Sequence, residues 1–130
     1  MAEDVMTIRQ MCDAFEVTPR TLRFYESKEL LFPIREGTRR LFTRRDRARL
    51  TLILRGKRFG FSLEEIRQLL DLYDADPHHR RQLEAALEIG HGRLSALIEE
   101  RERLDDAIGE LRSQLDRGRE RLDKMREEAA

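Results

Sequence analysis

The sequence predicts a mainly α-helical chain, with a compact domain over residues 1–76 and a coiled-coil dimerisation helix over residues 77–130. Three observations support this fold class. In the first half, capping residues precede apolar residues at helical spacing. Two short apolar runs in the same half flank an arginine-rich segment. In the second half, apolar residues recur at alternating spacings of four and three. Charged residues make up 40% of the 130 residues and aromatic residues 6%, a composition too polar for one compact globule but suited to a long exposed helix.

The first predicted helix begins with a Thr-x-x-Gln capping box formed by Thr7 and Gln10. Apolar residues follow at helical spacing: Ile8, Met11, Cys12 and Phe15. A short turn at residues 16–17 comes next, and we expect Val17 to be its buried residue. The turn leads directly to a second helix, so the segment predicts two helices joined by a tight turn.

The second predicted helix has Thr18 as its N-cap and Pro19 at its first position, where a missing N–H costs nothing. We expect Leu22 to face the core, and four residues to point away from it: Arg20, Thr21, Arg23 and Tyr25. An exposed helix N-terminus with these side chains donates hydrogen bonds to phosphates and base edges. The residues alone leave a second interpretation open, an ordinary amphipathic helix with a solvated basic face.

Two short apolar runs, residues 30–34 and 41–43, flank an arginine-rich segment from Arg35 to Arg40. Pro33 disfavours a helix here and Gly37 supplies a turn, so we expect a β-hairpin with an arginine-rich tip. Two helices joined by a tight turn and followed by such a hairpin form a winged helix-turn-helix domain.

Two further helices complete the predicted domain. The first begins at Thr43, with Asp46 as its capping partner, and basic residues and a glycine mark its end: Lys57, Arg58 and Gly60. A capping box of Ser62 and Glu65 opens the second. We expect this helix to break within residues 74–77, with Asp76 as a cap and Pro77 in the first turn of the next helix.

Charge is distributed unevenly, although the formal net charge of the chain is +0. Residues 35–58 contain ten Lys and Arg against two acids, a net charge of +8. Residues 77–130 contain 11 basic and 13 acidic residues, a net charge of −2. Because a local basic patch determines DNA affinity, the neutral total does not argue against DNA binding.

Three segments together resemble the N-terminal domain of the MerR (mercury-resistance regulator) family: TIRQMCDAFEVTPRTLRFYE, REGTRRLFTRRD and GFSLEEIRQLLDLYD. The resemblance covers about residues 5–74 and keeps the order of the family's motifs. It implies a winged helix-turn-helix DNA-binding domain that acts as a symmetric dimer. Because the chain ends at Ala130, at the end of the predicted dimerisation helix, we expect a short form of the family, without a separate effector domain.

The resemblance assigns roles to individual residues. Arg20, Thr21 and Arg23 would face the major groove, Tyr25 would hold a phosphate, and Arg40 would lie on the wing beside the DNA backbone. Many family members have Gly-Tyr-Arg in the wing where this chain has Thr38-Arg39-Arg40, so Arg39 would replace a phosphate-contacting tyrosine. The complete expected DNA-binding set is Thr18, Arg20, Thr21, Arg23, Tyr25, Arg39, Arg40 and Lys57.

The second half contains a seam of thirteen positions spaced alternately four and three residues apart, ten of them apolar. They are Leu83, Leu87, Gly90, Leu94, Leu97, Arg101, Leu104, Ile108, Leu111, Leu115, Gly118, Leu122 and Met125. Such a helix cannot bury its stripe alone, so we expect a second copy as its partner. The periodicity does not distinguish parallel from antiparallel pairing; the family resemblance implies an antiparallel coiled coil. Arg101 either extends its head to solvent or pairs with a facing Glu and sets the register.

Few residues suit other chemistry. Cys12 is the only cysteine, lies on an apolar helix face and is expected to be a core residue without redox function. His78 and His79 are neighbours and His91 lies more than three turns away, so we expect no metal site and no other cofactor. We find no catalytic constellation and expect no enzymatic activity. The N-terminus has no apolar run and the chain no apolar stretch long enough to span a membrane, so the sequence predicts a cytoplasmic protein.

Three functions remain open. The first is a homodimeric transcriptional regulator on an inverted-repeat operator; by family resemblance it would distort promoter DNA that RNA polymerase also binds. The second is a DNA-bending architectural or excisionase-like protein. The third is a protein-interaction function, in which the coiled coil binds a partner protein and the basic N-terminal patch is incidental. An inducer of the first would bind between the dimerisation helix and the winged domain.

Overall fold

The computed structural model describes residues 4–75 and 78–130. The fold is mainly helical with one small sheet, as predicted. The chain divides into two compact units, Met1–Ile89 and Gly90–Ala130, which are described separately below. The domain boundary predicted between residues 76 and 77, and the expected roles of Asp76 and Pro77, fall outside the described residues.

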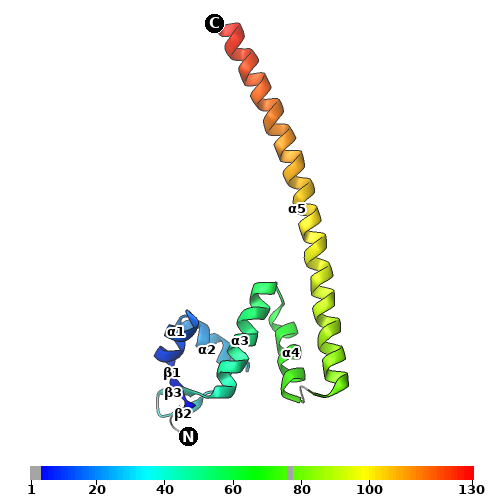
Figure 1. Cartoon of the computed structure of the whole chain (residues 1–130). Helices are drawn as coiled ribbons and strands as arrows, with labels where there is room; N and C mark the ends of the chain where they lie inside the picture. Colours follow the sequence, from blue (N-terminus) through cyan, green and yellow to red (C-terminus); the bar gives the residue numbers. More distant parts are fainter. Residues whose placement is uncertain (1–3, 76–77) are drawn as a thin grey trace. The chain divides into compact units, whose positions relative to one another are not determined.

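Eight elements follow one another along the described part of the chain (Figure 1). In order they are β1 (Met6–Thr7), α1 (Ile8–Phe15), α2 (Pro19–Ser27), β2 (Ile34–Glu36), β3 (Arg39–Phe42), α3 (Arg44–Phe59), α4 (Leu63–Ala75) and α5 (Arg80–Ala129).

Local capping interactions begin the helices where the sequence predicts. Thr7 and Gln10 form the predicted reciprocal capping box of α1, and Thr43 and Asp46 form that of α3. In the capping box of α4, the Ser62 backbone N–H donates to the Glu65 carboxylate at 2.9 Å and the Glu65 N–H donates to the Ser62 hydroxyl at 3.1 Å. The α3 helix ends at Gly60 in the left-handed conformation, the expected glycine C-cap.

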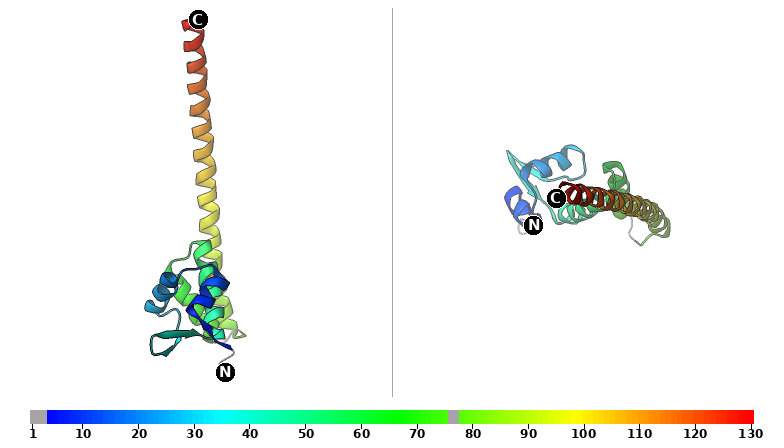
Figure 2. Two further views of the ribbon diagram at one scale, coloured as in Figure 1. Left: turned by 90° about the vertical axis from the view of Figure 1, so that its left-hand side faces the viewer. Right: turned by 90° about the horizontal axis from the view of Figure 1, so that it is seen from above.

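The sheet has three antiparallel strands in the order β1-β3-β2. Gly37 takes a φ of 61° in the turn of the predicted hairpin, whose strands pair Arg35 with Arg40. Figure 2 shows β2 and β3 projecting from the helical part of the unit. The pairing corrects the expected arginine-rich tip, because the arginines lie in the strands and only residues 37–38 form the turn. Leu30 and Leu31, at the start of the apolar run that precedes the hairpin, are buried core residues outside β2.

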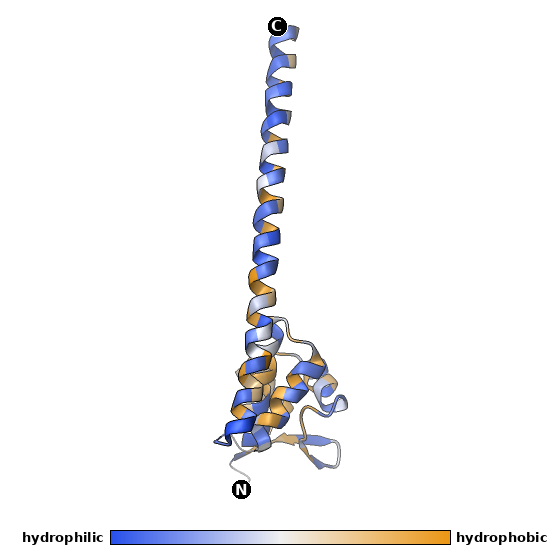
Figure 3. Ribbon diagram, turned by 90° about the vertical axis from the view of Figure 1, so that its right-hand side faces the viewer, coloured by the Kyte–Doolittle hydropathy of each residue, from blue (hydrophilic) through white to orange (hydrophobic). Residues whose placement is uncertain are grey.

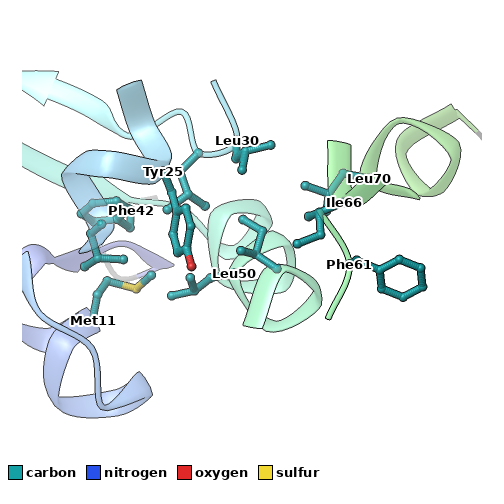
Figure 4. Packing of buried hydrophobic residues seen from close by; sticks show 11 residues of the cluster. Met11, Tyr25, Leu30, Phe42, Leu50, Phe61, Ile66 and Leu70 are labelled. Atoms are coloured by element: carbon teal, nitrogen blue, oxygen red, sulfur yellow. The ribbon is translucent and has the colours of Figure 1, made fainter. Parts of the chain in front are cut away.

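The core of the N-terminal unit gathers residues from α1 to α4, from β3 and from the segments between them: Met11, Leu22, Tyr25, Leu30, Leu31, Phe42, Leu50, Ile53, Phe61, Ile66 and Leu70. Figure 4 shows the ring of Tyr25 between Phe42 and Leu50. Tyr25 is 5% exposed, so the expectation that it points away from the core is wrong. It shares the inward face of α2 with Leu22, three residues earlier.

Two buried charged residues tie the segment between α2 and β2 to the later helices. The carboxylate of Asp46 accepts hydrogen bonds from the backbone N–H of Phe32 at 3.0 Å and of Thr43 at 3.2 Å. Arg49 donates to the carbonyl of Leu30 at 2.8 Å and forms an ion pair with Asp74. Asp74 was expected at a helix break but lies inside α4, which extends to Ala75.

The α5 helix has 50 residues and is about 75 Å long at roughly 1.5 Å per residue. Among the residues that the structure describes, none in this helix is buried. In Figure 3, apolar residues recur along α5 between hydrophilic ones. None of the described helices combines the length and apolar character that a membrane span requires.

Candidate nucleic-acid interface

The N-terminus of α2 is exposed and locally organised. The Thr18 hydroxyl accepts a hydrogen bond from the backbone N–H of Thr21 at 3.1 Å, and the hydroxyl oxygens of the two threonines lie 3.0 Å apart. Pro19 occupies the first turn, as expected. Thr18 therefore acts as a cap, and its hydroxyl is already engaged with Thr21, so any contact expected of it with DNA would have to share that hydroxyl.

Arg20 and Arg23 are exposed on α2, on a different face from the buried Leu22 and Tyr25. The helix is therefore amphipathic, with its arginine guanidinium groups in solvent and Leu22 and Tyr25 in the core, although Phe24 on the same helix is 44% exposed. Burial raises the pKa of the Tyr25 phenol. The phosphate contact expected of Tyr25 can involve only the hydroxyl end of this buried side chain.

The wing is held against α2 by Glu26. Its carboxylate binds Arg35 of β2 at 3.0 Å and Arg40 of β3 at 2.5 Å. The side chains of Glu26 and Arg40 are each 22% exposed, so this ion pair is partly shielded from water. Sequence reasoning missed Glu26, since nothing in its local pattern indicates that an acid in a basic helix will contact a hairpin nine to fourteen residues away.

The ion pairs change the interpretation of the basic segment 35–58. Five of its ten basic side chains bind acids outside the segment: Arg35, Arg40, Arg44, Arg45 and Arg49. The hydrogen bond with Asp74 is the main cause of a raised pKa at Arg45. The net charge of +8 therefore overstates the charge that this segment offers to DNA.

Arg39 is the wing arginine that forms no ion pair within the described residues. It is exposed at the start of β3 opposite Glu36. Lys57 lies in the last turn of α3, about 20 Å along the helix from Arg44 at roughly 1.5 Å per residue. The helix thus separates Lys57 from the wing end of α3.

The residues expected to form the dimer contact all lie on α5. Those named in the prediction are exposed apart from the half-buried Leu97: Leu87, Leu94, Leu97, Arg101, Leu104, Ile108, Leu111 and Leu115. Exposed apolar stripes of this length are uncommon on monomeric soluble proteins and usually mark a surface that a partner covers.

The residues considered for metal or redox chemistry are not grouped. No cluster of three potential metal ligands occurs in the described part of the chain. Cys12 is half-buried beside the core, and desolvation, with a smaller contribution from Asp13, raises the pKa of its thiol. A raised pKa reduces the thiolate fraction, so this position disfavours nucleophilic chemistry.

Two family descriptions match the chain. The family described as "MerR HTH family regulatory protein" matches residues 6–72, and the one described as "MerR, DNA binding" matches residues 47–114. The chain is 40% identical over 77 residues to the HTH-type transcriptional regulator ZntR of Escherichia coli strain K12, covering 58% of this chain and 55% of ZntR. The chain thus spans little more than half the length of that relative.

Solved structures show the same fold. A MerR family regulator from Bacillus cereus matches with a TM-score of 0.66 and 30% identity, covering 81% of this chain and 75% of that one. MtaN, the N-terminus of the Bacillus subtilis multidrug transporter activator, matches with a TM-score of 0.63 and 29% identity, over 85% and 97% of the two chains. HiNmlR, a regulator lacking its sensor domain and bound to promoter DNA, matches with a TM-score of 0.58 and 25% identity, over 78% and 79%.

Proposed function

The chain belongs to the MerR family of DNA-binding transcriptional regulators, and on that premise we propose that it acts as a homodimer on an inverted-repeat operator in promoter DNA. The observation that carries the proposal is the exposed cationic face of α2 beside a wing that Glu26 ties to the same helix. The ion pairs fix two DNA-facing elements relative to each other, which sequence-specific docking requires.

The α2 face supplies the base-reading part of the proposal. Arg23 and Arg20 lie in the first turns of the helix, where a recognition helix places the residues that contact base edges. An arginine reads guanine by donating two hydrogen bonds to O6 and N7. Arg39 on the wing would bind phosphate, because a guanidinium outside the groove contacts the backbone without reading sequence.

The exposed seam of α5 supports the homodimer. Leu104 and Leu111 are 57% and 59% exposed, and a helix with such a stripe stays folded by pairing with another helix. A second copy supplies an identical stripe, and an isologous pairing forms a closed dimer. The family resemblance favours the antiparallel arrangement. Two winged units on one dimer axis would read two half-sites related by the same two-fold symmetry.

We extend the proposal to distortion of the promoter. The promoter DNA bound to HiNmlR supports promoter DNA as the ligand class. A dimer that fixes the distance between two reading heads binds best to DNA bent or untwisted to match that distance. RNA polymerase would respond to the changed alignment of the promoter elements.

Selection of bound fragments from genomic DNA at moderate salt, followed by footprinting, tests the proposal. We expect a protected inverted repeat between promoter elements, with a hypersensitive centre where the duplex is deformed. Broad binding without a pattern, lost as salt rises, would contradict sequence-specific regulation and favour the architectural function.

A charge-reversal pair, Arg20→Glu with Arg23→Glu, separates DNA reading from coiled-coil binding. We expect this variant to lose operator binding and transcriptional output. The matched control, Arg103→Glu with Arg117→Glu, makes the same charge change at exposed positions of α5 outside the seam. Unchanged output in the α2 variant would show that the coiled coil alone carries the function.

A further inference from the structure

Phe24 is an exposed aromatic side chain in the second turn of α2. It follows Arg23 directly and precedes Tyr25, whose ring is buried in the core. The core of the N-terminal unit, as the structure describes it, does not include Phe24, either among its buried residues or among the partly buried ones packed against them. The fold therefore leaves this ring facing solvent on a helix that otherwise exposes polar and charged side chains.

The ring lies on the side of α2 that carries the base-reading candidates. Arg20 and Thr21 precede Phe24 by four and three residues, so the three side chains share one side of the helix. Helical side chains point toward the N-terminus of their helix, so the ring of Phe24 covers the turn of Arg20 and Thr21. Leu22 and Tyr25 occupy the buried side. Phe24 is therefore an apolar group on the face that we propose enters the major groove.

Two neighbours hold the Phe24 ring in place. The ammonium of Lys28 lies 5.6 Å from the ring centroid, and the centroid of the Tyr25 ring lies 5.8 Å away with an angle of 54° between the two planes. A ring that is positioned before binding loses less side-chain entropy when it makes a contact. The ammonium also places a positive charge beside the ring, and phosphates flank every base edge in a groove.

The chemistry of the ring restricts what it can recognise on a base edge. In the major groove thymine presents its C5-methyl group, whereas the other base edges present mainly hydrogen-bond donors and acceptors. A phenyl ring offers neither a donor nor an acceptor. It gains free energy by covering a methyl group and loses it by desolvating an amino or carbonyl group without replacing the hydrogen bond. Such a ring favours thymine.

We propose that Phe24 is a specificity-determining residue that contacts the C5-methyl group of one thymine in each half-site of the operator. The inference rests on the proposed function, because it requires α2 in the major groove, and it adds a base preference to it. Each half-site then combines a guanine read by an arginine of α2 with a nearby thymine read by Phe24.

The competing interpretation is a solvated ring without a target. Single exposed apolar side chains are common on protein surfaces and need no partner. The surroundings of Phe24 favour DNA, because three exposed cationic side chains lie on the same short helix or at its end: Arg20, Arg23 and Lys28. An apolar protein surface that covered the ring would desolvate these charges, whereas DNA phosphates would pair with them.

Replacement of thymine by deoxyuridine tests the proposal, because it removes only the C5-methyl group. The probe is a synthetic duplex of the footprinted inverted repeat, with copies in which each symmetry-related pair of thymines is replaced in turn. We expect the full chain to be sensitive at one position per half-site. The loss should be roughly fourfold when one half-site is changed and roughly fifteenfold when both are, the ratio for one buried methyl group in each.

Three variants assign the sensitivity to a side chain. Phe24→Ala should abolish the ratio of thymine to deoxyuridine affinity at this position, and alanine keeps α2 helical. Phe59→Ala removes the same ring from a similarly exposed position of α3 and should keep the ratio. Thr21→Ser removes the neighbouring methyl group but retains the hydroxyl, and should also keep it. Circular dichroism should show the same helix content in all three.

The outcomes separate this proposal from the proposed function. Sequence-specific binding by the wild-type chain with equal affinity for every thymine and deoxyuridine duplex would overturn the role of Phe24 and leave the regulator intact. So would a Phe24→Ala variant that keeps the ratio, or a Thr21→Ser variant that loses it. A wild-type chain that does not distinguish the inverted repeat from unrelated DNA would refute both proposals.

Discussion

The N-terminal unit and the α5 helix beyond Gly90 differ in where their apolar side chains go. In the first unit Leu22, Leu30 and Leu50 are fully buried in a shared core. Beyond Gly90 no residue is buried, although leucines recur there at regular spacing. The same residue type is therefore buried within the chain in one region and exposed in the other, where the proposed dimer would cover it. A leucine in this sequence therefore does not by itself indicate a core position, and its burial has to be assessed within each unit.

The largest effect is expected from substitutions in the exposed seam of α5. Leu104→Asp with Leu111→Asp should abolish dimer formation and operator binding. Each buried leucine contributes about 1.5–3 kcal/mol, and each change occurs twice in a symmetric dimer. Sedimentation should show a species near 15.5 kDa, and circular dichroism should show loss of α5 helicity with a folded N-terminal unit.

Ser113→Asp is the control for this pair, because it adds the same charge to α5 away from the seam. It should leave the dimer intact. A monomeric Leu104→Asp, Leu111→Asp variant that still bound operator tightly would contradict the role assigned to α5.

The next effect concerns the self-contained unit. Arg23→Ala should cost about 1–3 kcal/mol of specific binding and relax the preference at one base pair, if the guanidinium reads a base edge. Competition binding with operator variants measures both quantities. Arg117→Ala on α5 is the control. An unchanged preference at every base pair would show that Arg23 does not read the groove.

Replacing a glycine by alanine should change the free energy of unfolding in opposite directions in the two regions. A Cβ at Gly56 would lie 2.8 Å from Cγ1 of the buried Ile66, whereas a Cβ at Gly109 would meet nothing within 4 Å. Overpacking costs about 1–3 kcal/mol and helix propensity returns about 1 kcal/mol. Gly56→Ala should therefore lower the free energy of unfolding by about 1 kcal/mol and Gly109→Ala should raise it by up to about 1 kcal/mol. Equal shifts in urea unfolding would refute the contrast.

The smallest effect is expected at the wing. Arg39→Ala should weaken binding to all DNA sequences alike and reduce the slope of log affinity against log salt by about 1. Titrations of operator and unrelated DNA at several salt concentrations measure this change. A loss confined to the operator would mean that Arg39 reads sequence.

Local signals predicted the fold well because capping depends on residues three positions apart. The pairs Thr7–Gln10, Thr43–Asp46 and Ser62–Glu65 start their helices as expected. The same periodicity could have revealed the burial of Tyr25, which follows Leu22 by three residues on α2. The hairpin was predicted, but not the strand register that places its arginines outside the turn.

The arrangement of the site was less predictable because it depends on contacts between distant residues. Glu26 binds both wing strands, and Asp74 binds two arginines 25 and 29 positions earlier. Local sequence does not encode which acid neutralises which base. The basic patch was therefore overestimated, whereas the exposed arginines of α2 were placed correctly from helical spacing alone.

The distance between spin labels on α5 tests the central claim, an antiparallel dimer formed by this helix, most directly. Glu120→Cys lies outside the seam, and Cys12→Ser leaves it as the only thiol. A two-fold axis near the middle of the seam would separate the two labels by roughly 40–50 Å at about 1.5 Å per residue. Pulsed dipolar spectroscopy should show this distance. A distance below about 20 Å, which parallel helices would give, or no dipolar coupling at all, would contradict the account.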